Sequence, residues 1–133
     1  MGTRSITVVK DRNGNKIIEM YQQYDGYLEG VGAELLAFIA SGGVVNGLGL
    51  TETRCRFNGM ECLAAQLVKE FKHGAGGTYL HAPTPDFQDK KKYYEKYSAE
   101  YYYEITLVDS ELELRAWDTY TGEEVTDDLV LPE

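Results

Sequence analysis

Hydrophobic and polar residues alternate in two parts of the chain, and this period of two is typical of strands that bury one face. Residues 5–9 are rich in β-branched side chains, residues 11–15 contain Asp, Asn and Gly, and residues 16–24 resume the strand pattern. Residues 100–109 and 111–118 alternate in the same way, with Asp109-Ser110 at the turn between them. The pattern predicts two β-hairpins.

Apolar residues between the hairpins recur every three or four positions, which is the spacing of amphipathic helices. The first such segment covers residues 31–39 and ends at a Ser-Gly-Gly sequence. The second covers residues 58–71 and begins with Asn58, a residue type that is favoured at helix N-caps. We expect the Asn58 side chain to cap this helix, with Glu61 three positions later, and to contribute about 1 kcal/mol of stability.

The remaining segments complete the expected fold. The composition of residues 78–81 predicts a short strand, and residues 83–96 are expected to form a polar excursion. The expected order is therefore β-β-α-α-β-β-β. Because neighbouring strands joined by short turns need no parallel crossover, we predict an α+β fold with an antiparallel sheet of about five strands. Both helices should pack on one face of the sheet, and the other face should be exposed to solvent. A chain of 133 residues is expected to form a single domain, residues 1–133.

Composition narrows the class of protein. Hydrophobic residues make up 43% of the chain and charged residues 26%, as in ordinary globular proteins, so the chain should fold without a partner. No apolar stretch approaches the roughly 18 residues of a membrane span, and no secretion signal precedes the first strand. Two cysteines are too few for a disulfide framework. We therefore expect a soluble cytosolic protein that contacts no membrane.

The net charge of -9 is concentrated in the C-terminal part of the chain. Residues 1–80 carry eight Lys or Arg and eight Asp or Glu, whereas residues 81–133 carry five and fourteen. Such a surface repels phosphate backbones, which argues against general nucleic-acid binding. It is suited to the basic surface of another protein, although an acidic solvated edge that keeps the protein soluble is the simpler interpretation. The acidic residues of interest are Glu123, Glu124, Asp127 and Asp128.

Aromatic and amide side chains are concentrated at the end of the second predicted strand. Tyr24 and Tyr27 flank Asp25, and two glutamines precede them. Aromatic rings beside amides and a carboxylate can stack on and hydrogen-bond a planar ligand such as a nucleobase. The same residues can equally form an aromatic edge of the core, with Asp25-Gly26 making a turn.

Evidence for catalysis or a metal site is weak in this sequence. Cys62 lies in the first turns of the second helix, where the pKa of a thiol can fall, but no sequence signature pairs it with His73 or His81. A small buried hydrophobe is the simpler interpretation of Cys62. Asn46-Gly47-Leu48-Gly49 could present backbone amides to a ligand, although a plain turn explains it better. We predict no cofactor and no metal.

Four motifs resemble a family of small uncharacterised proteins of tailed bacteriophages. The motifs are Gly2-Thr3-Arg4-Ser5, Gln22-Gln23-Tyr24-Asp25-Gly26-Tyr27, Val45-Asn46-Gly47 and Phe57-Asn58-Gly59-Met60 followed by Cys62-Leu63-Ala64-Ala65-Gln66-Leu67. The chain departs from the family at residues 28–32, where Pro-Ser-Gly-His-Gly is common, and at Gln22 and Glu61, where arginine and glycine are common. These departures argue against a histidine- or arginine-dependent activity. The resemblance implies a phage origin and an accessory role without an assigned reaction.

We therefore predict a non-catalytic binding protein that inhibits or sequesters a host component, such as a defence factor, in the host-cell cytosol. A host protein with a basic surface would meet the acidic C-terminal half and its tyrosines, which are Tyr93, Tyr94, Tyr97, Tyr101, Tyr102 and Tyr103. The alternative target is a nucleotide-derived small molecule. Its predicted contacts are Arg4, Tyr24, Asp25, Tyr27, Asn46, Asn58 and Gln66. A third class, an enzyme acting on a nucleotide, lacks a recognisable nucleophile or metal set.

Overall fold

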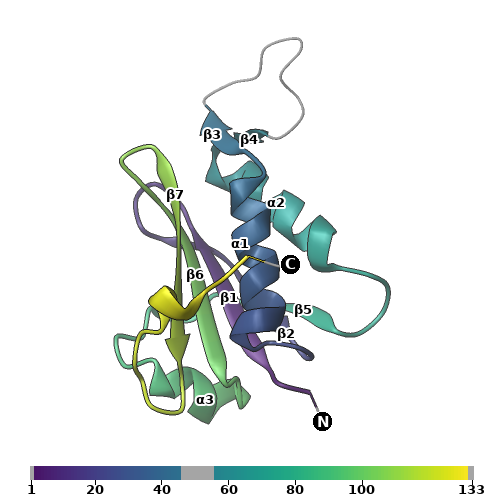
Figure 1. Ribbon diagram of the computed structural model, residues 1–133, viewed down its shortest axis with the longest axis vertical. Coiled ribbons are helices and arrows are strands. Elements are labelled where there is room, and N and C mark those ends of the chain that lie inside the picture. The colour runs from purple at the N-terminus through teal and green to yellow at the C-terminus, as the bar shows by residue number, and fades with distance from the viewer. Residues whose placement is uncertain (1, 46–55, 132–133) are drawn as a thin grey trace.

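A twisted sheet forms the centre of the computed structural model, which describes residues 2–45 and 56–131 (Figure 1). Within these residues the sheet has five strands in the order β5-β2-β1-β6-β7. The strands are β1 (Ser5–Lys10), β2 (Lys16–Gln22), β5 (Thr78–His81), β6 (Tyr101–Val108) and β7 (Glu111–Asp118). The helices are the π-helical turn η1 (Leu28–Gly32), α1 (Ala33–Ala40), α2 (Gly59–Phe71), α3 (Lys91–Tyr97) and the 3-10 turn η2 (Thr126–Asp128). A separate pair of parallel strands, β3 (Gly43–Val45) and β4 (Arg56–Asn58), joins α1 to α2.

Both predicted hairpins are confirmed, and their turns explain why. Between β1 and β2, Oδ1 of Asp11 accepts hydrogen bonds of 2.9 Å from the backbone amides of Asn13 and Asn15. Between β6 and β7, Asp109 and Ser110 both have positive φ angles of 50° and 68°. Two consecutive positive φ values are characteristic of the tight turns that match the twist of a hairpin.

The prediction of a purely antiparallel sheet is wrong, because β1 and β6 are parallel. After β5 the chain passes through α3 and returns to the end of the sheet where β1 begins (Figure 1). There the backbone amide of Glu100 donates a 2.8 Å hydrogen bond to the carbonyl of Arg4. Strand β6 therefore starts beside the start of β1 and runs in the same direction. The predicted α+β class is confirmed, but the sheet is mixed. The structure also contains three elements that were not predicted, β3, β4 and α3.

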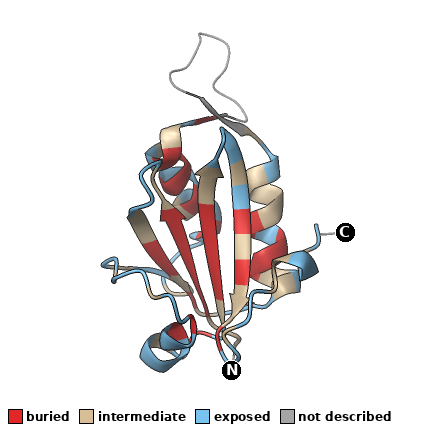
Figure 2. Cartoon of the chain, turned by 90° about the vertical axis from the view of Figure 1, so that its left-hand side faces the viewer, coloured by how far each residue is buried: buried red, intermediate tan, exposed pale blue. Residues whose placement is uncertain are grey.

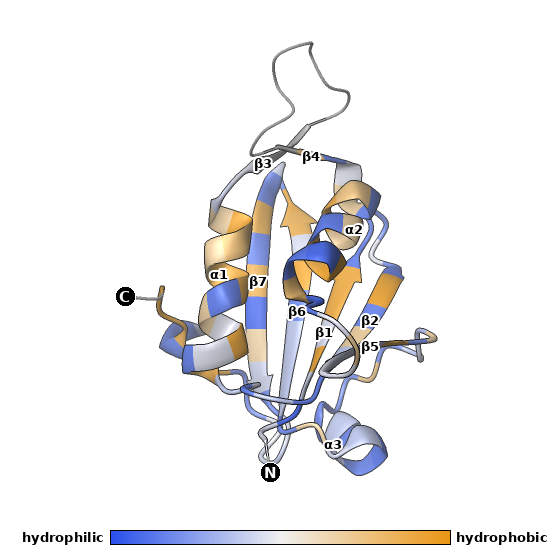
Figure 3. Cartoon of the chain, turned by 90° about the vertical axis from the view of Figure 1, so that its right-hand side faces the viewer, coloured by the Kyte–Doolittle hydropathy of each residue, from blue (hydrophilic) through white to orange (hydrophobic). Residues whose placement is uncertain are grey.

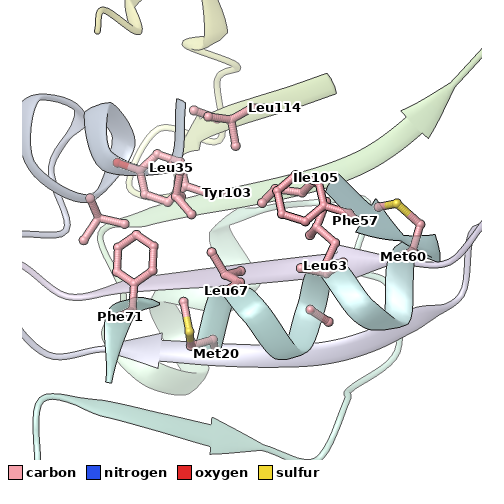
Figure 4. Packing of buried hydrophobic residues seen from close by; sticks show 14 residues of the cluster. Met20, Leu35, Phe57, Met60, Leu63, Leu67, Phe71, Tyr103, Ile105 and Leu114 are labelled. Carbon is pink, nitrogen blue, oxygen red and sulfur yellow. The ribbon is translucent and has the colours of Figure 1, made fainter. Parts of the chain in front are cut away.

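Helices α1 and α2 cover one face of the sheet, as expected (Figure 3). Apolar residues of α2 at helical spacing, Leu63, Leu67 and Phe71, are buried against the strands. In Figure 4 these side chains lie close to Met20 of β2 and Ile105 of β6. Burying side chains of this size contributes about 1.5–3 kcal/mol each, so this layer is the main source of stability.

The opposite face of the sheet is partly covered, which corrects the prediction that it is wet. Residues 82–98, including α3, pack against one end of this face (Figure 2). Tyr93 of α3 stacks on Tyr102 of β6 with ring centroids 4.3 Å apart, and both side chains are fully buried. Phe87 and Trp117 pack against the same cluster. The segment predicted to be a polar excursion, residues 83–96, therefore contributes to a second, aromatic core.

Asn58 occupies the N-cap position of α2, as predicted, but its side chain makes no capping hydrogen bond. The φ and ψ angles of Asn58 are -84° and 76°, and the following Gly59 has a φ of 85°. The predicted capping contribution of about 1 kcal/mol therefore does not apply to this side chain.

Candidate functional site

Two adjoining recesses of about 370 Å³ and 640 Å³ lie between α1, the end of α2 and the segment before β5. They share Glu34, Phe71 and His73, so we treat them as one surface and call it the helix groove. Figure 3 shows the elements that form its walls. The polar side chains that line it are Gln22, Tyr24, Asp25, Glu34, Ser41, Gln66, Lys69, Glu70, His73 and Thr78.

A tight turn after β2 positions the predicted residues Tyr24 and Asp25. Asp25 has a φ of 58°, and its carbonyl accepts a 2.8 Å hydrogen bond from the amide of Val31. A Cβ atom added to Gly30 would stand only 2.3 Å from that carbonyl oxygen, so the close approach requires glycine. The turn leaves the Tyr24 side chain 58% exposed at the edge of the groove.

The groove has an acidic character. Asp25, Glu34 and Glu70 line it, with Lys69 as the cationic side chain among its lining residues. In the described part of the chain, the carboxylates of Glu34 and Glu70 form no ion pair and no side-chain hydrogen bond. Exposed carboxylates repel phosphate and attract cations. Sequence reasoning missed Glu34 and Glu70, because on a helix surface they look like ordinary solvated residues.

The structure does not bring the whole predicted ligand set together. Gln66 lines the groove and accepts a 3.2 Å contact from the Cys62 thiol. Arg4 and Tyr27 do not line it, and Asn58 lies in another recess of about 360 Å³. The Tyr27 hydroxyl contacts Asp25 at 3.4 Å, and the charge of that carboxylate raises the pKa of Tyr27. Asn46 lies outside the described residues.

The acidic C-terminal residues divide into two kinds. Glu124 is structural: Arg115 donates to it through Nε at 3.1 Å and Nη2 at 2.6 Å, and these bonds lower the pKa of Glu124. Glu123, Asp127 and Asp128 are exposed, and their side chains form no ion pair within the part of the chain that the structure describes. We call these three residues the acidic turn. The turn lies beside the start of α1, because Leu129 packs at Gly32.

Three of the six C-terminal tyrosines are buried core residues, which corrects their predicted role as a contact surface. Tyr93, Tyr102 and Tyr103 are fully buried. By contrast, Tyr94 is 40% exposed and forms an edge-to-face pair, at 5.8 Å, with Tyr120, which is 74% exposed. Sequence reasoning missed Tyr120, although its position in a turn after the last strand favours exposure. This pair is an exposed aromatic contact area in the C-terminal part of the chain.

A basic recess of about 420 Å³ lies on the α3 side of the sheet and was not predicted. Lys10, Lys90 and Arg115 line it together with Trp117. Each cation already has a carboxylate partner within the chain: Lys10 contacts Asp86 at 2.6 Å and Glu104 at 3.0 Å, Lys90 contacts Asp86 at 3.7 Å, and Arg115 contacts Glu124 at 2.6 Å. The Lys90 ammonium lies over the rings of Tyr102 and Trp117 at 4.8 Å and 5.0 Å. The cations are therefore engaged by the protein itself.

Within the described residues, no group of three or more His, Cys, Asp or Glu side chains is placed to hold a metal ion. None of the helices described is both long and apolar enough to cross a membrane. Comparison of the chain with protein-family models, curated proteins and solved structures finds no match. The candidate surfaces are therefore the helix groove, and the acidic turn with the Tyr94–Tyr120 pair.

Proposed function

We propose that the protein is a non-catalytic, phage-type accessory protein that binds a basic surface of a host protein and inhibits that protein in the host cytosol. A host defence component is the proposed target. The observation that carries this proposal is the set of exposed carboxylates in the acidic turn that form no ion pair among the described residues. Lys10, Lys16, Lys90 and Arg115 each contact a carboxylate of the same chain. The carboxylates of the acidic turn are exposed and have no such partner among the described residues.

Unpaired exposed carboxylates suit this role because they act at a distance. Their field accelerates the encounter with a basic partner and disfavours acidic ones. The exposed Tyr94–Tyr120 pair adds large, rigid side chains of the kind that dominate binding energy in protein interfaces. Together they provide long-range attraction and a short-range aromatic contact.

The nucleotide-derived ligand has weaker support. The groove that contains Tyr24 and Asp25 is lined by further carboxylates and not by Arg4. The basic recess, which has the charge for a phosphate, has its cations paired internally. An anionic ligand would have to displace these pairs, of which the buried Lys10–Glu104 pair is the most costly to break.

An enzyme acting on a nucleotide also has little support from the geometry. The Cys62 thiol contacts the Gln66 amide oxygen, which cannot accept the proton of a nucleophile as a histidine does. We therefore favour a binding protein over an enzyme that acts on a nucleotide.

Affinity capture from host lysate tests the proposal. The neutralised variant Glu123→Gln, Asp127→Asn, Asp128→Asn is compared with a matched control, Glu61→Gln, Glu95→Gln, Glu111→Gln, which removes the same charge from exposed residues elsewhere. Wild type and control should capture the same basic host protein and inhibit its purified form, whereas the neutralised variant should capture clearly less. Equal capture by both variants would overturn the proposal. Mass spectrometry of the denatured protein that finds a released nucleotide instead would favour the small-molecule alternative.

A further inference from the structure

A buried amine lies at the wall of the basic recess on the α3 side of the sheet. Lys90 is 8% exposed, and it lines this recess of about 420 Å³ together with Phe87 and Trp117. Its Nζ donates a 2.7 Å hydrogen bond to the backbone carbonyl of Phe87. A carbonyl oxygen can accept from a neutral amine as well as from an ammonium. This hydrogen bond therefore does not require Lys90 to be charged.

The charged form of Lys90 receives little support from its carboxylate neighbour. The Asp86 carboxylate lies 3.7 Å from Nζ of Lys90, which is beyond hydrogen-bond distance. The same carboxylate contacts the Lys10 ammonium at 2.6 Å, and its side chain is about half exposed, so that water screens its charge. An ammonium that is buried without a hydrogen-bonded carboxylate loses its water and gains little in return. Such a site favours the neutral amine.

Groups that favour and groups that oppose the charge surround Lys90. They are Asp86 before α3, Tyr93 of α3, Lys10 of β1, Lys16 of β2, Tyr102 and Glu104 of β6, and Arg115 and Trp117 of β7. The two carboxylates and the aromatic rings favour the ammonium, whereas Lys10 and Lys16 oppose it. Burial is the largest of these effects and lowers the pKa of Lys90 below the ordinary value of 10.5.

We propose that Lys90 is a nucleophilic amine that binds a small aldehyde covalently in the basic recess. The amine nitrogen attacks the carbonyl carbon and forms a C–N bond. The carbonyl oxygen then leaves as water with the two amine protons, so that R–NH2 and R′–CHO give the imine R–N=CH–R′ and H2O. This step needs no oxidant or reductant. Desolvated lysines near other cations are the ones that proteins use for such bonds.

The rest of the recess indicates which aldehyde fits. Lys10 and Arg115 are paired with carboxylates of the same chain, so an uncharged aldehyde fits better than an anionic one. Phe87 and Trp117 provide aromatic walls for an apolar or aromatic body. The inference goes beyond the proposed function and is independent of it, because it involves no residue of the acidic turn.

Reductive trapping of the whole protein with benzaldehyde and cyanoborohydride tests this site. Cyanoborohydride reduces an imine to a stable secondary amine, so peptide mapping by mass spectrometry identifies the lysine that reacted. The matched control is Lys92, an exposed lysine of α3. With limiting benzaldehyde at pH 7, Lys90 should carry about threefold more label than Lys92, or a higher excess. Both lysines are compared within the wild-type chain, so the result does not depend on the folding of a variant.

The pH dependence and an unfolded control identify the cause of the excess. A lowered pKa makes the free amine available at lower pH, so the ratio of Lys90 to Lys92 labelling should be highest near neutral pH. The ratio should fall as the pH approaches 10.5, where an ordinary lysine is also half deprotonated. In urea, which removes the recess, the ratio should be about one. Lys90→Met should lower the label on the intact protein at pH 7 more than Lys92→Met does.

Three outcomes would overturn the inference. If Lys90 is labelled no more than Lys92 at pH 7, its amine is either charged or closed to the aldehyde. If the ratio of labelling does not change with pH, a lowered pKa is not the reason for the excess. If the excess persists in urea, it comes from the local sequence and the recess has no part in it.

Discussion

The hydroxyl of Tyr97 in α3 donates a 2.6 Å hydrogen bond to Oε2 of Glu19, a fully buried carboxylate of β2. The other carboxylate oxygen accepts from the Lys16 ammonium at 3.0 Å and from the Thr84 hydroxyl at 2.8 Å. A buried carboxylate is stable only when such donors replace the lost water. The covering segment, residues 82–98, and the sheet therefore depend on each other.

We expect Tyr97→Phe to lower the free energy of unfolding by about 2 kcal/mol, because it removes a hydrogen bond to a buried charge. The matched control is Tyr94→Phe in the same helix, where the ring is 40% exposed and forms an aromatic contact through its face or edge rather than its hydroxyl. That variant should stay within about 0.5 kcal/mol of wild type. Urea unfolding measures both values. Equal values for the two variants would contradict a specific role for the Tyr97–Glu19 bond.

Acid should weaken the same contact. Burial alone would raise the pKa of Glu19, but hydrogen bonds from Tyr97, Lys16 and Thr84 outweigh it and hold the pKa below its ordinary value of 4.5. The ionised form is therefore favoured by folding, and its contribution is complete above pH 4.5 and is lost as the pH falls through the folded-state pKa.

The pH dependence is measured against Glu19→Gln, which keeps the shape of the side chain and cannot ionise. Wild type should be more stable than this variant at pH 6, and the difference in urea midpoint should shrink at pH 3. Because the other carboxylates titrate in both proteins, the difference isolates Glu19. If the difference in urea midpoint between wild type and Glu19→Gln stays constant or widens in acid, the charge of Glu19 does not stabilise the fold.

Local patterns predicted the elements whose stability is set within a few residues. The Asp11 side chain and the Asp109-Ser110 turn specify the two hairpins, and Leu63, Leu67 and Phe71 mark the buried stripe of α2. These signals involve neighbours in the sequence, so they can be recognised without knowledge of the tertiary structure.

Local patterns could not predict which strands pair when they lie far apart in the sequence. The parallel contact of β1 with β6 joins residues almost a hundred positions apart, and no local signal specifies it. Helix α3 was missed because most of its residues are exposed and charged, although Tyr93 and Tyr97 are spaced four apart and both face the sheet. Glu19 and Glu104 looked like solvent-facing strand residues, whereas Lys16, Lys10 and tyrosine hydroxyls allow their burial.

The helix groove was predicted only in part. Tyr24, Asp25 and Gln66 were expected in a site, and the structure does place them along one surface. Glu34 and His73 reach that surface only because α1 and the end of α2 pack next to each other. The charge of the groove, which decides the kind of ligand, therefore depends on tertiary packing.

Lys10 and Lys90 line the same basic recess, yet their removal should have different effects. Burial tends to lower the pKa of Lys10, but hydrogen bonds to Asp86 and Glu104 outweigh burial and raise that pKa, whereas burial lowers the pKa of Lys90. The charge of Lys10 is thus stabilised by folding and that of Lys90 is not. Lys10→Met would leave Glu104 buried without its cation.

We expect Lys10→Met to lower the free energy of unfolding by about 2 kcal/mol or more, since one partner of a buried pair is removed. Lys90→Met replaces an ammonium that lies over the Tyr102 and Trp117 rings by an apolar side chain. This variant should lower the free energy of unfolding less than Lys10→Met does, or raise it. Trp117 is the single tryptophan of the chain and packs in this cluster, so its fluorescence follows unfolding in both variants. A greater loss in Lys90→Met than in Lys10→Met would contradict this assignment of the charges.

The last prediction concerns how the acidic turn acts on the captured partner. Exposed charges steer encounter and are screened over about 10 Å at 0.1 M salt, so they change the association rate more than the dissociation rate. We expect the neutralised variant of Glu123, Asp127 and Asp128 to associate several-fold more slowly than wild type at low salt. The difference in association rate should narrow as salt is added. Salt screens the electrostatic attraction of the wild-type carboxylates, and the neutralised variant already lacks that attraction.

Glu124 provides the internal control for this measurement. Its carboxylate accepts two hydrogen bonds from Arg115 and a 2.8 Å bond from the Thr126 hydroxyl, so Glu124→Gln weakens structural contacts as well as removing a charge. Glu124→Gln should lower thermal stability, whereas the neutralised variant should unfold as wild type does. Surface-immobilised partner and a salt series give the two rate constants for each protein. If the neutralised variant instead dissociates faster while its association rate and salt dependence match wild type, the acidic turn makes short-range contacts and does not steer, because a steering charge acts before contact is made.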